Sequence, residues 1–158
     1  MTFRFLYFGK PREDYLILGI REYEKRLSKY GKVVLESLPE ERLSGRPSEG
    51  EIAAALEKEA RRASLRLKEG EALLVADVHA PLLSSSSFQD RIDSLTARRG
   101  MLVFLFGSSY GLSDSLRKRA DFLFSLSPLT FTHYQALLLT LEQVYRTEKS
   151  LHGETYDK

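Results

Sequence analysis

The chain has no cysteine, only three histidines and no long apolar run, and each shortage excludes a class of protein. Without cysteine there is no disulfide framework, no thiolate nucleophile and no cysteine-based metal site. The histidines, His79, His133 and His152, do not have the spacing of a metal-ligand motif, so we expect no metal site. No segment approaches the roughly 18 consecutive apolar residues that a membrane-spanning helix requires.

Net charge is also low, at +2, but it is distributed unevenly. The first 32 residues hold eight Lys and Arg against four Asp and Glu, whereas the other 126 residues hold 16 against 18. A basic amino-terminal region is typical of proteins that contact a phosphate backbone, although from charge alone an ordinary solvated helix face is the commoner explanation. Residues 1–6 are too short and too quickly polar for a secretory signal, so we expect a cytoplasmic protein.

Apolar segments alternate with amphipathic ones along all 158 residues, with no repeat and no linker between them. This length and a hydrophobic content of 42% indicate one globular domain, residues 1–158. The alternation predicts an α/β fold, with a mostly parallel sheet covered by helices on both faces. Strands are expected at 3–8, 33–38, 72–76, 101–106 and 122–127, and helices at 13–29, 49–68, 88–99, from Ser113 or Asp114 onward, and through 142–146.

Two loops in the last third of the chain are rich in small and hydroxyl residues. One follows the strand 101–106 and contains Gly107 and Gly111, and the other follows the strand 122–127. Because parallel strands end at one edge of a sheet, these loops can form a ligand cradle, although two plain turn glycines are the alternative. No Gly-x-Gly-x-x-Gly follows the first strand, which disfavours a dinucleotide-binding oxidoreductase.

Five motifs occur in order along the chain. They are the Gly9-Lys10 turn with the helix sequence Glu-Tyr-Glu-Lys-Arg-Leu at 22–27, Gly-Ser-Ser-Tyr-Gly-Leu-Ser at 107–113, Ser-Leu-Ser-Pro-Leu-Thr-Phe-Thr-His at 125–133, Glu-Gln-Val-Tyr-Arg at 142–146, and Gly-Glu-Thr-Tyr at 153–156. Together they resemble the ribosomal RNA large subunit methyltransferase H family of the SPOUT superfamily, over essentially the whole chain. The resemblance implies a carboxy-terminal deep trefoil knot.

This resemblance also implies an activity and a set of cofactor-binding residues. Family members use S-adenosylmethionine to methylate N3 of a pseudouridine in 23S ribosomal RNA on the ribosome, and they act as homodimers with each active site at the subunit interface. The cofactor site then consists of Ala76, Gly107, Ser108, Gly111, Leu126, Ser127, Pro128, Leu129, Thr130 and Phe131.

Methylation at N3 requires a group that accepts the N3 proton, because protonated N3 is a poor nucleophile. By resemblance, Arg146, Tyr156 and Asp157 are the catalytic candidates. A frayed chain end is the alternative for Tyr156 and Asp157, and an ion pair with Glu142 is the alternative for Arg146. The cations expected to bind RNA phosphates are Lys10, Arg12, Lys25, Arg26 and Lys158.

Four residues differ from the family pattern near the expected chemistry. Ser108 replaces a glycine, Thr132 a proline, Leu137 an arginine and Asp157 a histidine. Two further functions therefore remain open, namely a SPOUT RNA methyltransferase with another target base, and a catalytically weak module that binds ribosomes or RNA. Cofactor binding separates the second of these from the enzymes.

Overall fold

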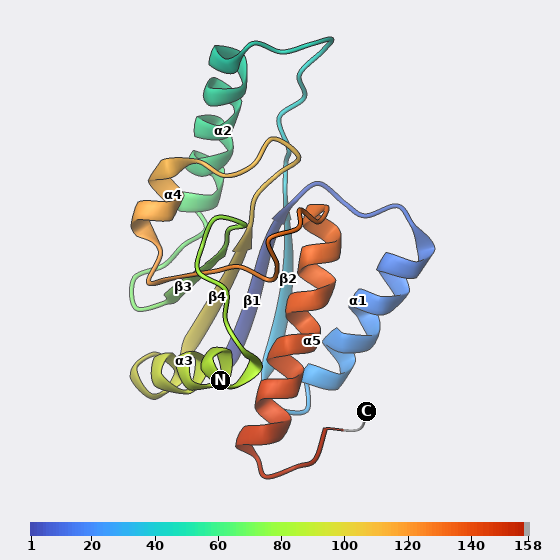
Figure 1. The fold of residues 1–158 in the computed structure, drawn as a ribbon, viewed down its shortest axis with the longest axis vertical. Coiled ribbons are helices and arrows are strands. Elements are labelled where there is room, and N and C mark those ends of the chain that lie inside the picture. The colour runs from blue at the N-terminus through green and yellow to red at the C-terminus, as the bar shows by residue number, and fades with distance from the viewer. Residues whose placement is uncertain (157–158) are drawn as a thin grey trace.

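The computed structural model describes residues 1–156, which contain one sheet of five parallel strands in the order β2-β1-β4-β3-β5 (Figure 1). Every ladder in the sheet is parallel, as the alternating pattern of strands and helices predicts. The strands are β1 (Thr2–Phe8), β2 (Lys32–Leu38), β3 (Ala72–Ala76), β4 (Met101–Phe106) and β5 (Phe122–Phe124).

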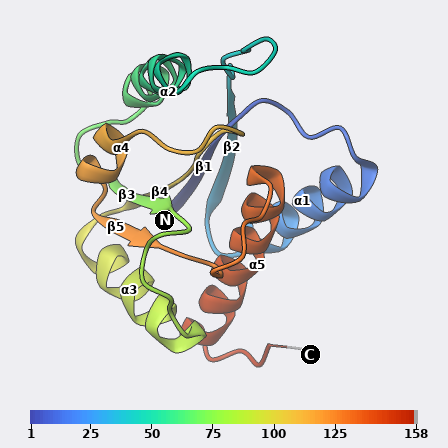
Figure 2. The same ribbon diagram turned by 45° about the horizontal axis from the view of Figure 1, so that its top comes forward.

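Five helices cover both faces of the sheet. Figure 2 shows α2 and α4 on one face and α1, α3 and α5 on the other, so the predicted fold class is confirmed. None of the described helices is long and apolar enough to cross a membrane. The helices are α1 (Asp14–Leu27), α2 (Glu49–Ser64), α3 (Ser85–Arg98), α4 (Asp114–Arg119) and α5 (His133–Leu151).

Two elements are shorter than the sequence pattern predicts. The last strand ends at Phe124 instead of residue 127, because it pairs only with β3, and β3 itself ends at Ala76. Helix α2 ends at Ser64 instead of residue 68. The turn that follows it is fixed by Arg4, which donates a hydrogen bond to the Arg66 carbonyl oxygen at 3.1 Å.

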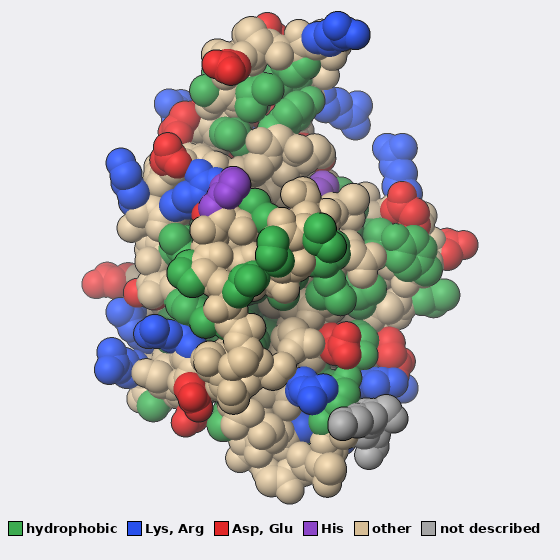
Figure 3. All heavy atoms as spheres, viewed as in Figure 1, with side chains coloured by type: hydrophobic (Ala, Val, Ile, Leu, Met, Phe, Trp, Pro, Cys, Tyr) green, Lys and Arg blue, Asp and Glu red, His purple; other side chains and the backbone are tan. Residues whose placement is uncertain are grey.

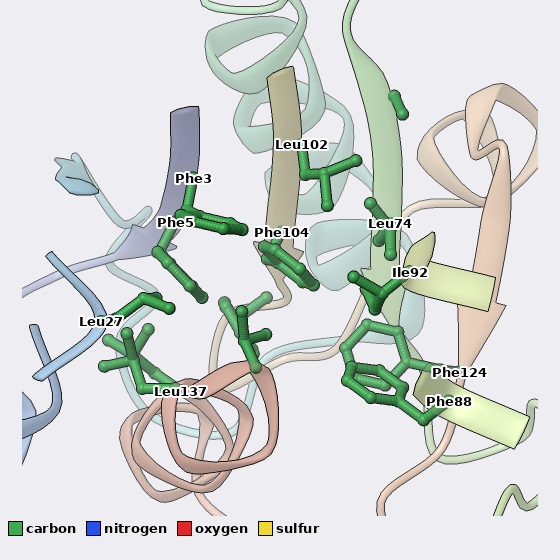
Figure 4. Close-up of a cluster of buried hydrophobic side chains, with 14 of the residues drawn as sticks. Phe3, Phe5, Leu27, Leu74, Phe88, Ile92, Leu102, Phe104, Phe124 and Leu137 are labelled. Atoms are coloured by element: carbon green, nitrogen blue, oxygen red, sulfur yellow. The ribbon is translucent and has the colours of Figure 1, made fainter. Parts of the chain in front are cut away.

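The larger part of the core lies between the sheet and helices α1, α3 and α5, and phenylalanine is its commonest residue (Figure 4). Phe5 and Phe104 stack across neighbouring strands with their ring centroids 4.9 Å apart. Phe88 of α3 packs edge-on against Phe124, and Leu137 of α5 is fully buried in the same cluster. Each such side chain contributes about 1.5–3 kcal/mol through burial, which fixes α5 firmly against the sheet.

Hydroxyl side chains cap four helices at their amino-terminal ends. The capping box predicted at Ser48 and Glu51 is present at the start of α2. Ser84, Ser113 and Thr132 accept hydrogen bonds from backbone N–H groups at the starts of α3, α4 and α5. Because these three helices follow β3, β4 and β5, their caps hold the connecting loops in place at the carboxyl edge of the sheet.

Candidate active site

A cavity of about 720 Å³ lies at the carboxyl ends of β3, β4 and β5, where Ala76, Phe106 and Phe124 end their strands and line it. Its volume is in the range of small-molecule sites. Pro128, one of the ten predicted cofactor-binding residues, is exposed and does not line the cavity. The other nine do, namely Ala76, Gly107, Ser108, Gly111, Leu126, Ser127, Leu129, Thr130 and Phe131.

The loop after β4 forms a very tight turn. Ser108 and Gly111 exchange two backbone hydrogen bonds, each 3.0 Å long. Gly111 has a φ of +106°, which side chains disfavour, and a Cβ on Gly107 would overlap the carbonyl oxygen of Gly111. The turn therefore requires glycine at both positions, and it also leaves the backbone of the loop open to the cavity.

Hydrogen bonds from serine to glutamate attach this loop to helix α2 and to the segment that follows β2. The Ser108 hydroxyl donates to Glu59 of α2 at 2.6 Å, and Glu59 is only 2% exposed. Glu59 also accepts a hydrogen bond from the Glu41 N–H at 3.0 Å. Burial raises the pKa of Glu59 above its ordinary value, against the effect of these two hydrogen bonds. Two further serines make bonds of the same kind, Ser109 to Glu40 at 2.6 Å and Ser113 to Glu57 at 2.8 Å.

An ion pair between buried Asp77 and partly exposed Arg117 forms another part of the cavity wall. Asp77 follows β3 directly and accepts hydrogen bonds from the His79 N–H at 3.1 Å and from Arg117 Nε at 2.8 Å. Burial alone would raise the pKa of Asp77, but these two partners outweigh it and hold the pKa below its usual range. The Arg117 side chain is 30% exposed and lines the cavity. Sequence reasoning missed both residues, although the position of Asp77 at the end of a buried strand was an available signal.

The first residues of α5 close the cavity on the side of β1. His133 Nε2 lies 2.8 Å from the carbonyl oxygen of Phe8, and the rings of His133 and Tyr134 are 3.9 Å apart at their centroids. Both side chains line the cavity. Among residues 1–156, no group of three or more His, Cys, Asp or Glu is arranged to hold a metal ion.

The catalytic candidates lie near the other end of α5. The Arg146 guanidinium is 4.5 Å from the ring centroid of Tyr156, and the Tyr156 hydroxyl donates to Glu142 at 2.9 Å. Glu142 thus bonds Tyr156 instead of forming the alternative ion pair with Arg146. Along the helix axis, Arg146 lies roughly 15 Å from Ala136, the last residue of α5 that lines the cavity, at 1.5 Å of rise per residue. Asp157 lies outside the described residues.

The end of the described chain is also held in place, unlike a frayed terminus. Glu154 pairs with Lys29 of the α1–β2 turn at 2.9 Å. Burial, followed by the hydrogen bond to Glu142, raises the pKa of Tyr156 far above its ordinary value. The phenol of Tyr156 therefore stays protonated across the physiological pH range.

The cations predicted to bind RNA fall into two groups. Lys10 and Arg12 are exposed in the loop after β1, near the cavity. Lys25 and Arg26 lie in the last turn of α1, where Arg26 pairs with Glu22 at 2.8 Å. Lys158 lies outside the described residues, so the described cations belong to two separate places on the surface.

Comparisons with known proteins identify the family. Residues 1–157 match the family described as "Predicted SPOUT methyltransferase". The ribosomal RNA large subunit methyltransferase H of Alkaliphilus oremlandii is 37% identical over 151 residues, 95% of each chain. The enzyme of the same name from Syntrophomonas wolfei is 36% identical over 159 residues, the full length of both chains.

A solved methyltransferase of Legionella pneumophila, determined with SAM bound, shares the fold with a TM-score of 0.51. The two chains are 14% identical, and the match covers 92% of this chain and 66% of that one. The end-to-end similarity to the curated relatives, at more than a third of positions, confirms the resemblance expected from the five motifs. This chain belongs to the ribosomal RNA large subunit methyltransferase H family of SPOUT methyltransferases.

Proposed function

We propose that this chain, acting as a single SPOUT domain of residues 1–158, uses S-adenosylmethionine to methylate N3 of a pseudouridine in 23S ribosomal RNA. The reaction takes place on the ribosome, in the cytoplasm. One observation carries the proposal in a chain of this family: three separate segments, each following a different strand, converge on a single cavity at the carboxyl edge of the sheet. These are the segments in which the family resemblance predicts cofactor-binding residues.

The residues around the cavity fit S-adenosylmethionine. Gly107 and Gly111 leave backbone groups accessible, as recognition of an adenine ring requires, and Leu126 and Phe131 supply apolar surface for that ring. When bound, the cofactor supplies a methyl group on a sulfonium, and the protein has to align the target nitrogen with it.

The residues at the far end of α5 would handle the target base and its proton. Because its only hydroxyl proton is donated to Glu142, Tyr156 would offer the base its ring and its oxygen lone pairs, and as a neutral phenol it is a poor acceptor of the N3 proton. Asp157 then remains as the group that accepts the N3 proton. Arg146, whose guanidinium stacks on Tyr156, would hold the base or the adjacent phosphate.

A homodimer would bring these two sets of residues together. Arg146 is too far along α5 to reach the cavity of its own chain, so the site needs a second copy. Apolar side chains stand exposed beside the cavity, with Leu129 72% and Tyr15 62% exposed, and Leu18 of α1 65% exposed. Figure 3 shows apolar atoms gathered across the middle of this face, which is a suitable surface for a partner.

The trefoil knot stays a prediction from the resemblance. A parallel bridge between Leu82 and Ser125 places the loop after β3 beside the loop after β5. A chain crossing near the cavity would require such a contact. The knot is a rare topology, and no local pattern in the sequence indicates it.

The activity can be tested by incubating the protein with labelled S-adenosylmethionine and ribosomes that lack the modification, followed by mass-spectrometric mapping. We expect the methyl group on N3 of the family's pseudouridine. A methyl group on another nucleotide would show a different target base. Absence of transfer, together with cofactor binding in calorimetry, would leave a ribosome- or RNA-binding module.

The dimer can be tested by mixing two impaired variants, Arg146→Ala and Gly107→Ala, at an S-adenosylmethionine concentration too low to occupy the Gly107→Ala site. If each site combines the cavity of one subunit with Arg146 of the other, a mixed dimer contains one intact site. Random mixing then restores about a quarter of the wild-type activity, because half of the dimers are mixed and half of their sites are intact. An inactive mixture would show that each site is formed within one chain.

A further inference from the structure

A second hollow, of about 940 Å³, lies beside the cavity, between the loop after β1 and the loop after β2. Glu13 and Tyr134 line both hollows, so the second continues from the first. Lys10, Arg12 and Arg42 line the second hollow alone. We call it the basic groove.

The cations of the basic groove are available to a ligand. Lys10, Arg12 and Arg42 are exposed, and none of them forms an ion pair with another residue in the range 1–156. Figure 3 shows Lys and Arg side chains standing out at the upper right of this face, between the top loop and α1. Unpaired cations around a hollow form an electrostatic site for a chain of phosphates.

The carboxylates of the groove lie toward the cavity. Glu13 is shared between the two hollows, and Glu40 is engaged by the loop after β4. Glu40 Oε1 accepts both the N–H of Ser109, at 3.1 Å, and its hydroxyl, at 2.6 Å. A ligand that runs along the groove therefore meets acceptors near the cavity and cations farther away.

Tyr134 forms a fixed wall between the two hollows. Its ring is 3.9 Å from the ring of His133 and packs edge-on to Tyr7 at 6.4 Å, both measured between centroids. Its hydroxyl lies directly over Gly9, where a Cβ would overlap it. An aromatic ring held in this way offers a face on which a nucleobase can stack.

We infer that the basic groove binds the phosphodiester backbone of the RNA strand next to the target nucleotide. This inference rests on the proposed function, because the target base has to enter the cavity for the groove to receive its neighbours. An enzyme that modifies a base takes it out of the stack, and the flanking phosphates then need partners on the protein. Lys10, Arg12 and Arg42 contact those phosphates, while Tyr134 separates the target base from the adjacent one.

The test is binding of a short fluorescein-labelled oligouridylate to the full-length protein, followed by fluorescence anisotropy over a range of KCl concentrations. We expect Lys10→Ala and Arg42→Ala each to lower affinity several-fold at low salt. Each should also reduce the slope of log K against log[KCl] by about 0.7, the value for one lost phosphate contact on a single strand. Arg98→Ala, an exposed cation in the last turn of α3, is the matched control and should leave both quantities unchanged.

Groove variants that behave like Arg98→Ala would overturn the inference, as would a wild-type protein that does not bind the oligouridylate at low salt. Methyl transfer to ribosomes, measured in parallel, separates this result from failure of the proposed function. If the wild-type protein methylates ribosomes and the groove variants bind RNA as well as it does, the result rejects the role of the basic groove but not the proposed function. Inactive wild type that still binds RNA through Lys10 and Arg42 rejects the proposed function and supports the groove.

Discussion

The two ends of α5 differ in what surrounds them. At the amino-terminal end, His133 and Tyr134 face a cavity whose loops combine glycine and serine with apolar side chains such as Leu126 and Phe131. Near the carboxyl end, Arg146 and Tyr156 lie in a cluster of aromatic and charged side chains. The helix has 19 residues and is about 28 Å long. Side chains at its two ends are therefore too far apart to contact one another.

This difference divides the proposed chemistry into two parts. Small residues and hydroxyls suit close contact with a cofactor, whereas a cation and a phenol suit recognition of a base and its phosphate. Substitutions near the cavity should therefore change cofactor affinity, and substitutions near the carboxyl end should change turnover. The following variants test this separation, and we begin with the largest expected effect.

Replacement of Arg146 by alanine should lower methyl transfer on the order of 100-fold, because the target base loses a positioning contact. Cofactor affinity in calorimetry should stay at the wild-type value. Lys149→Ala removes a cation one turn farther along α5 and should retain most of the activity. An equal loss of cofactor affinity in Arg146→Ala would show that the two ends of the helix are not functionally separate.

Replacement of Gly107 by alanine should weaken cofactor binding at least about 10-fold, since the added Cβ overlaps the Gly111 carbonyl oxygen and the loop has to move. Isothermal titration with S-adenosylmethionine measures this effect. Gly100→Ala is the control, because a Cβ at that position has nothing within 4 Å. Normal affinity in Gly107→Ala would place the cofactor elsewhere.

Replacement of Glu59 by alanine should weaken cofactor binding several-fold and destabilise the fold by about 1–3 kcal/mol, because the Ser108 hydroxyl and the Glu41 N–H lose their acceptor. Calorimetry and urea unfolding at a fixed protein concentration measure the two effects. Glu59→Gln keeps one acceptor oxygen and should lie between alanine and wild type. If the loop after β4 does not depend on Glu59, cofactor affinity will be unchanged although stability falls.

The smallest effect concerns pH. Burial raises the pKa of Glu59 above 4.5, so the folded chain takes up a proton at higher pH than the unfolded chain. The stability this group contributes, relative to Glu59→Gln, is then fully present below pH 4.5 and is lost as pH rises through the folded-state pKa. Unfolding free energies of both proteins from neutral pH down to pH 4.5 measure it, and a difference independent of pH would contradict it.

The sequence predicted the strands and helices well, because these depend on local periodicity and on caps such as Ser48. The predicted end of the last strand was wrong, because that end is set by pairing with β3, and β5 stops where β3 stops. Nine of the ten predicted cofactor-binding residues line the cavity, because each lies at the end of a strand or in a loop that follows one. Their role stays a prediction.

By itself, the sequence determined a parallel α/β fold, the family, and the two small-residue loops at the edge of the sheet. Only the tertiary structure decided which distant side chains meet. Ser108 and Glu59 are 49 residues apart in the chain but share a hydrogen bond, because α2 packs beside the loop after β4. Arg146 follows the cavity closely in sequence yet lies far from it, because a rigid helix turns a short separation in sequence into a long distance in space.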